Sequence, residues 1–193
     1  MIEPIGILLA AGSASRFGSN KLLHPLLTGV PIAVTAARNL KAVVSKCIAV
    51  VRPGAAELSA LLESAGLEVV VCANADEGMG ASLACAVAAA GEQGGYMIAL
   101  ADMPYIRASS LEAVRDALMN GTHLVAPYFR ARRGHPVGIA RRFRAELLAA
   151  RGDEGAKKLL EAHAAELVKI PIGDPGVIRD IDTPGDLAPP LGV

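Results

Sequence analysis

Near the start of the chain, two cationic side chains follow a run of very small residues, an order typical of a phosphate-binding loop. The apolar run Ile5–Leu9 predicts a buried parallel strand. The next three residues, Ala10–Gly12, have no large side chain to keep a ligand from the backbone N–H groups. Arg16 and Lys21 follow within reach. A guanidinium and an ammonium are the groups that neutralise a triphosphate or its departing pyrophosphate.

Two familiar phosphate-binding signatures fail on this stretch. A Walker loop needs a glycine, four residues and then Gly-Lys-Ser/Thr, whereas here five residues separate Gly12 from Gly18 and two more precede Lys21. The dinucleotide fingerprint Gly-x-Gly-x-x-Gly fails because Ala14 stands in place of its second glycine. The stretch is therefore either a phosphate loop of another kind or an ordinary strand-to-helix turn with an exposed arginine and lysine.

A carboxylate with a possible chemical role is Asp102, which directly follows the apolar segment Tyr96–Ala101. We expect that segment to be a parallel strand, whose carboxyl end faces the crevice where open α/β sheets bind ligands. Ser109 and Glu112 have the spacing of a capping box for a helix over Leu111–Met119, so Asp102 is not needed as a helix cap. Hard carboxylate ligands without soft neighbours favour Mg²⁺.

Two other turns carry groups that suit a base or an anion. The small-residue segment Asn74–Ser82 leads into an alanine-rich helix, and Gly80 and Ser82 stand where free N–H groups could meet a base carbonyl or a phosphate. A plain loop with a helix cap is the alternative. The basic turn Arg130–Val137 suits a second anion, with a solvated hairpin as the alternative.

Several motifs of the chain resemble those of one family. Leu9-Ala10-Ala11-Gly12-x-Ser-x-Arg16-Phe-Gly18-x-x-Lys21 resembles the signature of the MobA-like nucleotidyltransferases, most closely the molybdenum cofactor cytidylyltransferases. Gly-Met-Gly-x-Ser-Leu resembles their segment that closes over the base, Ala-Asp-Met-Pro their metal motif, and Arg-Gly-His-Pro-Val an acceptor-side motif. The ending Asp-x-Asp-Thr-Pro-x-Asp-Leu resembles the segment that supplies a second metal carboxylate. The family's Gly-Asp-x-Gly-Ala-Arg is matched with Lys157 in place of arginine, so a bidentate contact there would become a point-charge contact.

The resemblance implies roles for individual residues. Arg16, Lys21 and Asp102 are expected to be catalytic, and Asp102 and Asp182 to hold the metal. The expected nucleotide-binding residues are Leu9, Ala10, Ala11, Gly12, Arg16, Lys21, Asn74, Gly80 and Ser82. The expected acceptor-binding residues are Arg133, Gly134 and His135. Asp180 and Asp186 lie close enough to Asp182 in the sequence to share or take its role.

Predicted strands alternate with predicted helices, which favours a parallel sheet covered by helices on both faces. Further strands are expected at Cys47–Val51, Leu67–Cys72, His123–Phe129, Val137–Ala140 and Leu167–Ile172. Helices are expected at Pro31–Val44 and Ala55–Ala65, in the alanine-rich segment that ends at Ala90, in a segment capped by Asp153, and in a short segment that starts at Thr183. The resemblance implies a single-domain, Rossmann-like three-layer sandwich with a mostly parallel sheet, of the nucleotide-diphospho-sugar transferase type. Residues 1–105 would bind the nucleotide, and residues 106–193 would bind the acceptor and supply the second metal carboxylate.

Composition narrows the class of protein further. The 193 residues include 19 basic and 19 acidic ones, a balance that argues against a surface built for nucleic acid or anionic membrane. No apolar stretch approaches the ~20 residues that span a bilayer, and no cation precedes the first apolar run, so we expect a soluble cytoplasmic protein. Cys47, Cys72 and Cys85 lack metal-binding spacing and are expected to be small buried hydrophobes.

The implied reaction is transfer of CMP from CTP to the phosphate of molybdenum-loaded molybdopterin, with Mg²⁺ as cofactor and pyrophosphate as leaving group. The preference for CTP depends on Ala11, where guanylyl-transferring relatives usually have glycine. A molybdenum hydroxylase would receive the product. The alternatives are GTP-dependent transfer to the same acceptor, transfer to another small phosphate, and a non-catalytic nucleotide-binding or cofactor-delivery module. Retention of Arg16, Lys21, Asp102 and Asp182 argues against the last.

Overall fold

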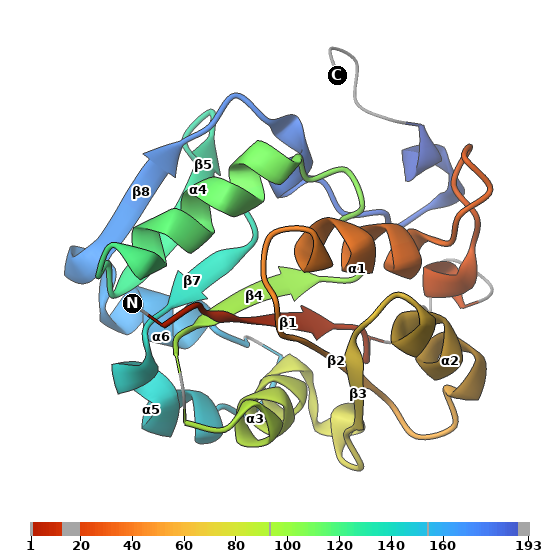
Figure 1. Cartoon of the computed structure of the whole chain (residues 1–193), viewed down its shortest axis with the longest axis horizontal. Coiled ribbons are helices and arrows are strands. Elements are labelled where there is room, and N and C mark those ends of the chain that lie inside the picture. The colour runs from red at the N-terminus through yellow and green to blue at the C-terminus, as the bar shows by residue number, and fades with distance from the viewer. Residues whose placement is uncertain (1, 13–19, 93, 154, 189–193) are drawn as a thin grey trace.

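The computed structural model describes residues 2–12, 20–92, 94–153 and 155–188, and these form one α/β unit around an eight-stranded sheet (Figure 1). The strands lie in the order β3-β2-β1-β4-β7-β5-β6, and β8 also pairs with β5. Their bounds are β1 Ile5–Leu9, β2 Cys47–Val51, β3 Glu68–Val71, β4 Tyr96–Leu100, β5 Leu124–Phe129, β6 Arg132–Arg133, β7 Val137–Ile139 and β8 Leu167–Pro171.

The sheet is mostly parallel, as the alternation of strands and helices predicts. The pairs β1–β2, β1–β4, β2–β3 and β5–β8 are parallel. The short strands β6 and β7 run antiparallel to their neighbours, because β5 turns back into β6 through a two-residue hairpin. The hairpin residues Arg130 and Ala131 have φ angles of 48° and 66°, the left-handed values that two-residue hairpins require.

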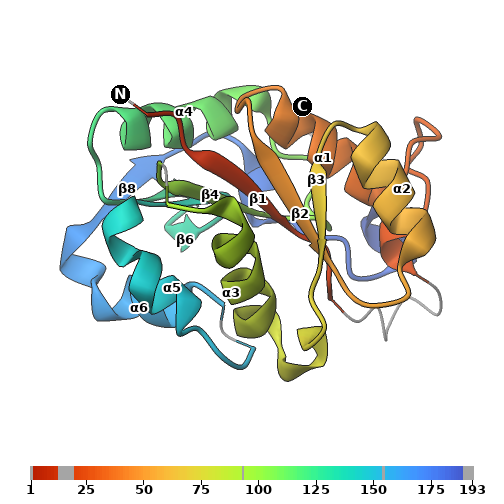
Figure 2. The same ribbon diagram turned by 60° about the horizontal axis from the view of Figure 1, so that its bottom comes forward.

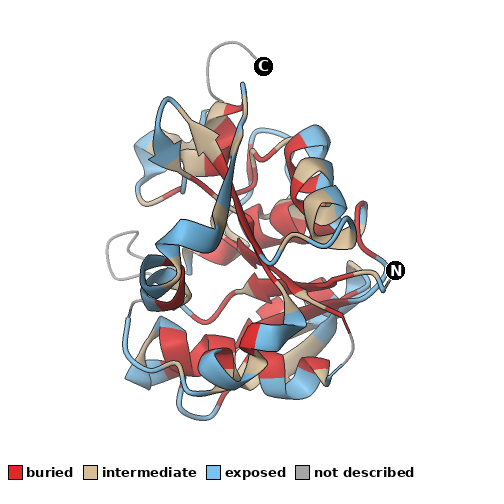
Figure 3. Cartoon of the chain, turned by 90° about the vertical axis from the view of Figure 1, so that its left-hand side faces the viewer, coloured by how far each residue is buried: buried red, intermediate tan, exposed pale blue. Residues whose placement is uncertain are grey.

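Helices cover both faces of the sheet, giving the expected three layers (Figure 2). The helices are α1 Ile32–Lys41, α2 Ala56–Ser64, α3 Met79–Ala90, α4 Ala108–Met119, α5 Arg144–Leu148 and α6 Lys157–Ala162. Alternate residues of β1 enter different cores: Leu8 packs with α1, α2 and α4, whereas Ile7 packs with α3, α5 and α6. The central strands are therefore buried on both sides (Figure 3).

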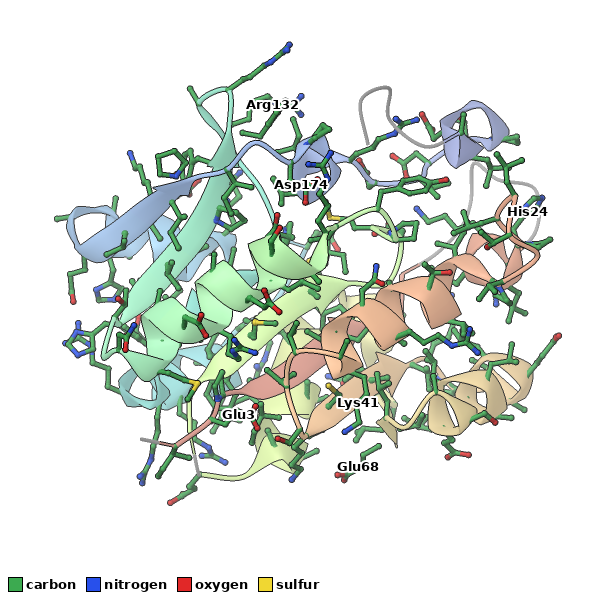
Figure 4. The ribbon with its side chains drawn as sticks, turned by 45° about the horizontal axis from the view of Figure 1, so that its top comes forward. Glu3, His24, Lys41, Glu68, Arg132 and Asp174 are labelled. Carbon is green, nitrogen blue, oxygen red and sulfur yellow. The ribbon has the colours of Figure 1, made fainter. Side chains whose placement is uncertain are left out.

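Helix ends differ most from the predictions. The helix α4 begins at Ala108 with Arg107 before it, so Ser109 lies inside the first turn and the predicted capping box with Glu112 is wrong. The buried carboxylate of Asp174, 66 residues from Ala108 in the sequence, serves this helix end instead, accepting from the Arg107 N–H and the Ser110 hydroxyl at 2.9 and 2.7 Å (Figure 4). Sequence spacing cannot reveal a cap supplied from so far along the chain.

Two other predicted ends have mixed outcomes. The helix α6 begins only at Lys157, after Ala156, so the prediction that Asp153 caps it is wrong. The short 3₁₀ helix η6, Pro184–Leu187, starts after Thr183 as expected and has a capping box in which Asp186 is the acidic partner.

Among the described residues, no helix combines the length and the apolar character needed to cross a bilayer.

Candidate active site

The carboxyl ends of β2, β1 and β4 meet at one edge of the sheet, and a cavity of about 470 Å³ opens there. The chain runs from β1 outward through β2 to β3 and then returns to place β4 on the other side of β1. The boundary between β1 and β4 is thus the switch point at which open α/β sheets bind ligands. The cavity is lined by Leu9, Ala11, Gly12, Lys21, Leu22, Arg52, Ala75, Asp76, Gly78, Met79, Ser82, Leu100, Asp102 and Asp153.

The predicted phosphate loop begins at this edge. Ala11 and Gly12 line the cavity, whereas Ala10 is buried in the core, where its N–H donates to the Val50 carbonyl. The guanidinium of Arg52, directly after β2, donates to the Ala11 carbonyl from Nε at 3.3 Å and from Nη2 at 2.9 Å. This fork fixes the start of the loop. The catalytic role predicted for Arg16 lies outside the described residues.

The predicted catalytic lysine lies between the two predicted metal carboxylates. Lys21 Nζ donates to Asp102 Oδ2 and to Asp182 Oδ1, both at 2.9 Å. Burial disfavours the charge on this ammonium, but the hydrogen bonds with both carboxylates outweigh burial and raise its pKa above the ordinary 10.5. Lys21 is therefore positively charged at neutral pH, and its side chain is only 14% exposed.

The structure separates the roles of the two aspartates that flank Asp182 in the sequence. Oxygens of Asp102, Asp180 and Asp182 lie within 4.8 Å of one another, close to the roughly 4.2 Å that separates opposite oxygens around one Mg²⁺. Asp180 is exposed, but partial desolvation and then the charges of the other two carboxylates raise its pKa. Asp186 instead accepts from the Thr183 N–H and hydroxyl at 2.8 and 2.7 Å, and these bonds lower its pKa.

These carboxylates fit a hard divalent cation. Asp102 Oδ1 is buried and has no hydrogen-bond partner among the described residues, so this oxygen can ligate a cation or accept a hydrogen bond from a ligand. Three carboxylates with no thiol or imidazole in the group form the all-oxygen donor set that Mg²⁺ and Mn²⁺ prefer. The Ile181 N–H donates to the Asp102 carbonyl at 2.9 Å and so fixes the C-terminal segment against the end of β4.

The other end of the cavity lies at the start of α3. Of the three nucleotide-binding residues predicted for this region, one lines the cavity and two have other partners. Ser82 lines the cavity and is 3% exposed. The Gly80 N–H is not free for a base, because it donates to the Gly152 carbonyl at 2.7 Å. The Asn74 side chain lies outside the cavity lining and contacts Glu77 and Cys72.

The segment around Gly152 closes this end of the cavity, a feature that the sequence did not predict. A Cβ atom at Gly80 would lie 2.7 Å from the Arg151 backbone, and one at Gly78 would lie 2.5 Å from Asp153 Oδ1. Glycine at both positions therefore allows two distant segments to approach closely. This contact brings Asp153 to the cavity wall, which Asp76 also lines. Carboxylates at this end are acceptors for N–H groups of a base.

The predicted acceptor residues have structural contacts and do not line this cavity. The Gly134 N–H donates to the Pro127 carbonyl, and the His135 N–H donates to the Val177 carbonyl. A Cβ atom at Gly134 would lie 2.3 Å from the Val177 oxygen, so glycine is needed there for packing. Burial lowers the pKa of His135, and the charge of Arg133 lowers it further, whereas a hydrogen bond with the Ile98 backbone and the charge of Asp102 oppose the shift. Arg133 lies on β6, in the hairpin on which Figure 4 labels Arg132.

Sequence reasoning assigned no site role to four residues that line the cavity, Arg52, Asp76, Met79 and Asp153. Arg52 lies in a loop without a motif, and the one usable signal was its place directly after a predicted parallel strand next to β1, since such positions face the same edge. Asp76, Met79 and Asp153 lie in segments that were singled out, the first two in Asn74–Ser82 and Asp153 in the segment that resembles Gly-Asp-x-Gly-Ala-Arg. The segments were thus recognised, but not these side chains.

Carboxylates and a lysine at the switch point of a mostly parallel sheet are groups suited to a divalent cation and a phosphorylated nucleotide. The chain belongs to the family of MobA-like NTP transferase domains, whose sequence profile matches residues 6–167. The expected family and the expected fold are thus confirmed.

Three relatives illustrate the extent of the similarity. Purine catabolism protein PucB of Bacillus subtilis is 30% identical over 194 residues, which cover 93% of this chain and 92% of PucB. The crystal structure of Rv0371c from Mycobacterium tuberculosis is 26% identical with a TM-score of 0.83 over 96% of this chain and 95% of that one. Its complex with manganese has a TM-score of 0.78 and 24% identity, over 95% of each chain. Molybdopterin-guanine dinucleotide biosynthesis protein A of Archaeoglobus fulgidus has a TM-score of 0.66 and 18% identity, over 95% of this chain and 94% of that one.

Proposed function

We propose that this chain transfers CMP from CTP to the phosphate of molybdenum-loaded molybdopterin and releases pyrophosphate. The observation that carries the proposal is the cluster of Asp102, Asp180 and Asp182 with Lys21 at the mouth of the switch-point cavity. A phosphate of the acceptor attacks the α-phosphorus of the nucleotide, a new P–O bond forms, and the bond to the β-phosphate oxygen breaks. The nucleophile is already ionised at neutral pH, so positioning and charge neutralisation suffice.

The side chains of the cluster divide this work. Asp102 and Asp182, joined by Asp180, would hold a Mg²⁺ ion, which when bound neutralises charge on the α-phosphate. The structure of the mycobacterial relative with manganese supports a divalent cation in this fold. Lys21, and in the same hypothesis Arg16, would neutralise the triphosphate, while the Arg52 fork keeps the start of the loop in place.

The base assignment is the finer part of the proposal. Ala11 lines the cavity at a position where guanylyl-transferring relatives usually have glycine, and this favours the smaller base of CTP. Ser82, Asp76 and Asp153 provide acceptors at the other end of the cavity for the N–H groups of that base. GTP on the same acceptor is the second candidate.

The acceptor would approach from the side of residues 106–193, which supply Asp180 and Asp182. We place molybdopterin there because the matched motifs resemble those of molybdenum cofactor enzymes, with a molybdenum hydroxylase as recipient of the product. Gly134 and His135 would act mainly by holding the Val177 segment that leads to Asp180 and Asp182, and Arg133 would contact the acceptor. Transfer to another small phosphate would use the same cluster.

Pyrophosphate release tests the proposal directly. The purified protein, Mg²⁺ and molybdenum-loaded molybdopterin are combined with CTP, GTP, ATP or UTP in parallel. Release with CTP alone supports the assignment. Release mainly with GTP supports the mechanism but overturns the assignment of cytosine as the base. No release with any of the four nucleotides overturns the proposed reaction. Nucleotide binding without any turnover would instead indicate the non-catalytic module.

A matched pair of variants tests the role of the cluster. Asp102→Asn should lower turnover by about 10³-fold, because one metal ligand and its charge are lost. Asp116→Asn, an equivalent change on the exposed surface of α4, should leave turnover unchanged. Near-normal turnover of Asp102→Asn at saturating Mg²⁺ would show that the metal does not bind there.

A further inference from the structure

Lys21 occupies the space between two carboxylates that a divalent cation would also use. Its Nζ lies 2.9 Å from Asp102 Oδ2 and 2.9 Å from Asp182 Oδ1. Both residues belong to the group of three whose oxygens lie within 4.8 Å of one another. An ammonium and a divalent cation repel each other strongly at such distances. The two cations therefore compete for the same oxygens.

Lys21 has a second place to go. Its side chain lines the cavity together with Ala11 and Gly12, the start of the predicted phosphate loop. A lysine ammonium is a point charge on a flexible four-carbon stem, so rotation about its side-chain bonds can carry it from the carboxylates towards phosphates bound in the cavity. Arg52 differs in this respect, since its guanidinium is fixed on the Ala11 carbonyl and no contact to the three carboxylates is seen among the described residues.

We propose that Lys21 is an exchangeable counter-ion that couples metal binding to nucleotide binding. It neutralises Asp102 and Asp182 until a divalent cation replaces it, and it then pairs with the triphosphate. Each ligand thereby removes a cost of binding the other: the metal frees the ammonium for phosphate, and the phosphate draws the ammonium away from the metal ligands. The inference rests on the proposed function, because it takes the carboxylates as metal ligands and the cavity as the nucleotide site.

The first test measures metal binding alone, with Mn²⁺ as the probe and electron paramagnetic resonance as the readout of free Mn²⁺. Lys21→Met keeps the length of the side chain and removes the competing charge. It should bind Mn²⁺ about tenfold more tightly than the unmodified protein when no nucleotide is present, a coupling of ordinary size between two sites. A role of Lys21 in merely holding the carboxylates in position predicts the opposite sign.

Arg52→Met is the matched control, because it removes one positive charge from the same cavity without removing a partner of Asp102 or Asp182. It should tighten Mn²⁺ less than threefold. Asp102→Asn in either background should abolish the tight site and so identify it. Circular dichroism shows whether Lys21→Met is folded, and Lys21→Gln replaces it if it is not.

The second test measures coupling. CTP is added in excess, and the Mn²⁺ that free CTP binds in solution is subtracted. The unmodified protein should then bind Mn²⁺ at least about tenfold more tightly than without nucleotide, and Lys21→Met should show a much smaller gain in affinity. The exchange is overturned if both Lys21 variants bind Mn²⁺ as weakly as the unmodified protein, or more weakly. The proposed function still stands in that case, provided that the protein binds Mn²⁺ through Asp102 and releases pyrophosphate. Absence of any site that depends on Asp102, in every variant, overturns both.

Discussion

Replacement of Asp174 by alanine should be among the most destabilising single changes outside the apolar core. Its side chain is 2% exposed and accepts three hydrogen bonds of 2.7–2.9 Å, from the Arg107 and Gly176 N–H groups and the Ser110 hydroxyl. The guanidinium of Arg107 lies 3.8 Å away and balances its charge. Asp174 thus joins the start of α4 to the 3₁₀ helix η5, Pro175–Ile178, which leads to Asp180 and Asp182.

The magnitude follows from these contacts. Hydrogen bonds to a charged group contribute about 1.5–3 kcal/mol each, so three of them set an upper range of roughly 4.5–9 kcal/mol. Water that enters the space left by the side chain recovers part of this, and the Arg107 guanidinium that remains is 35% exposed, so no buried charge is left unpaired. We therefore expect Asp174→Ala to lower the free energy of unfolding by about 3–5 kcal/mol.

Urea denaturation followed by circular dichroism measures this free energy. The control is Asp116→Ala, an exposed aspartate on the same helix, which should change it by less than about 0.5 kcal/mol. Asp174→Asn keeps the shape of the side chain and two acceptor sites on one oxygen, and should lie between the two. A loss below about 1 kcal/mol for Asp174→Ala would refute the reasoning that this carboxylate replaces a local helix cap.

Three further outcomes follow from single sites. Gly134→Ala should lower the free energy of unfolding by about 3 kcal/mol because its Cβ would lie 2.3 Å from the Val177 oxygen, whereas Gly173→Ala meets nothing within 4 Å and should be nearly neutral in the same urea titration. Burial raises the pKa of Cys47 to about 12, so alkylation by iodoacetamide at pH 8, followed by mass spectrometry, should be slow in the native protein and fast in urea. Burial lowers the pKa of His135 below its ordinary 6.5, so the unfolded chain takes up a proton that the folded chain does not. The contribution of His135 to the free energy of unfolding should be complete above pH 6.5 and should decrease at lower pH by up to about 1.4 kcal/mol per pH unit. His135→Gln should reduce this slope in EDTA-containing buffer.

The strands and the family were predictable because they depend on local patterns. Cys47–Val51 is a strand with the predicted bounds, and Tyr96–Leu100 ends one residue before the predicted end. A continuous apolar run between turn residues is a strong signal for a buried parallel strand. The position of Asp102 directly after such a run made its place in the site predictable as well.

The contacts between distant segments were not predictable, and they account for two of the differences between prediction and structure. Gly80 fits the expected helix start, but its N–H is taken by Gly152, more than 70 residues away. Ser109 and Glu112 have the right spacing for a cap, yet the buried Asp174 binds that helix end more strongly than a serine hydroxyl could. Local propensity is overruled where tertiary structure supplies a better partner.

The site depends on three segments that only the complete fold brings together. Lys21 meets Asp102 across 81 positions and Asp182 across 161. Asp182 reaches the cluster because the Ile181 N–H binds the Asp102 carbonyl, and the segment before it is held by Asp174. The end of the cavity at α3 is held separately, by the contact of Gly80 with Gly152. Because the two ends have different supports, substitutions in the Gly152 segment act first on the end at α3, whereas loosening the Asp174 contacts acts first on the segment that carries Asp180 and Asp182.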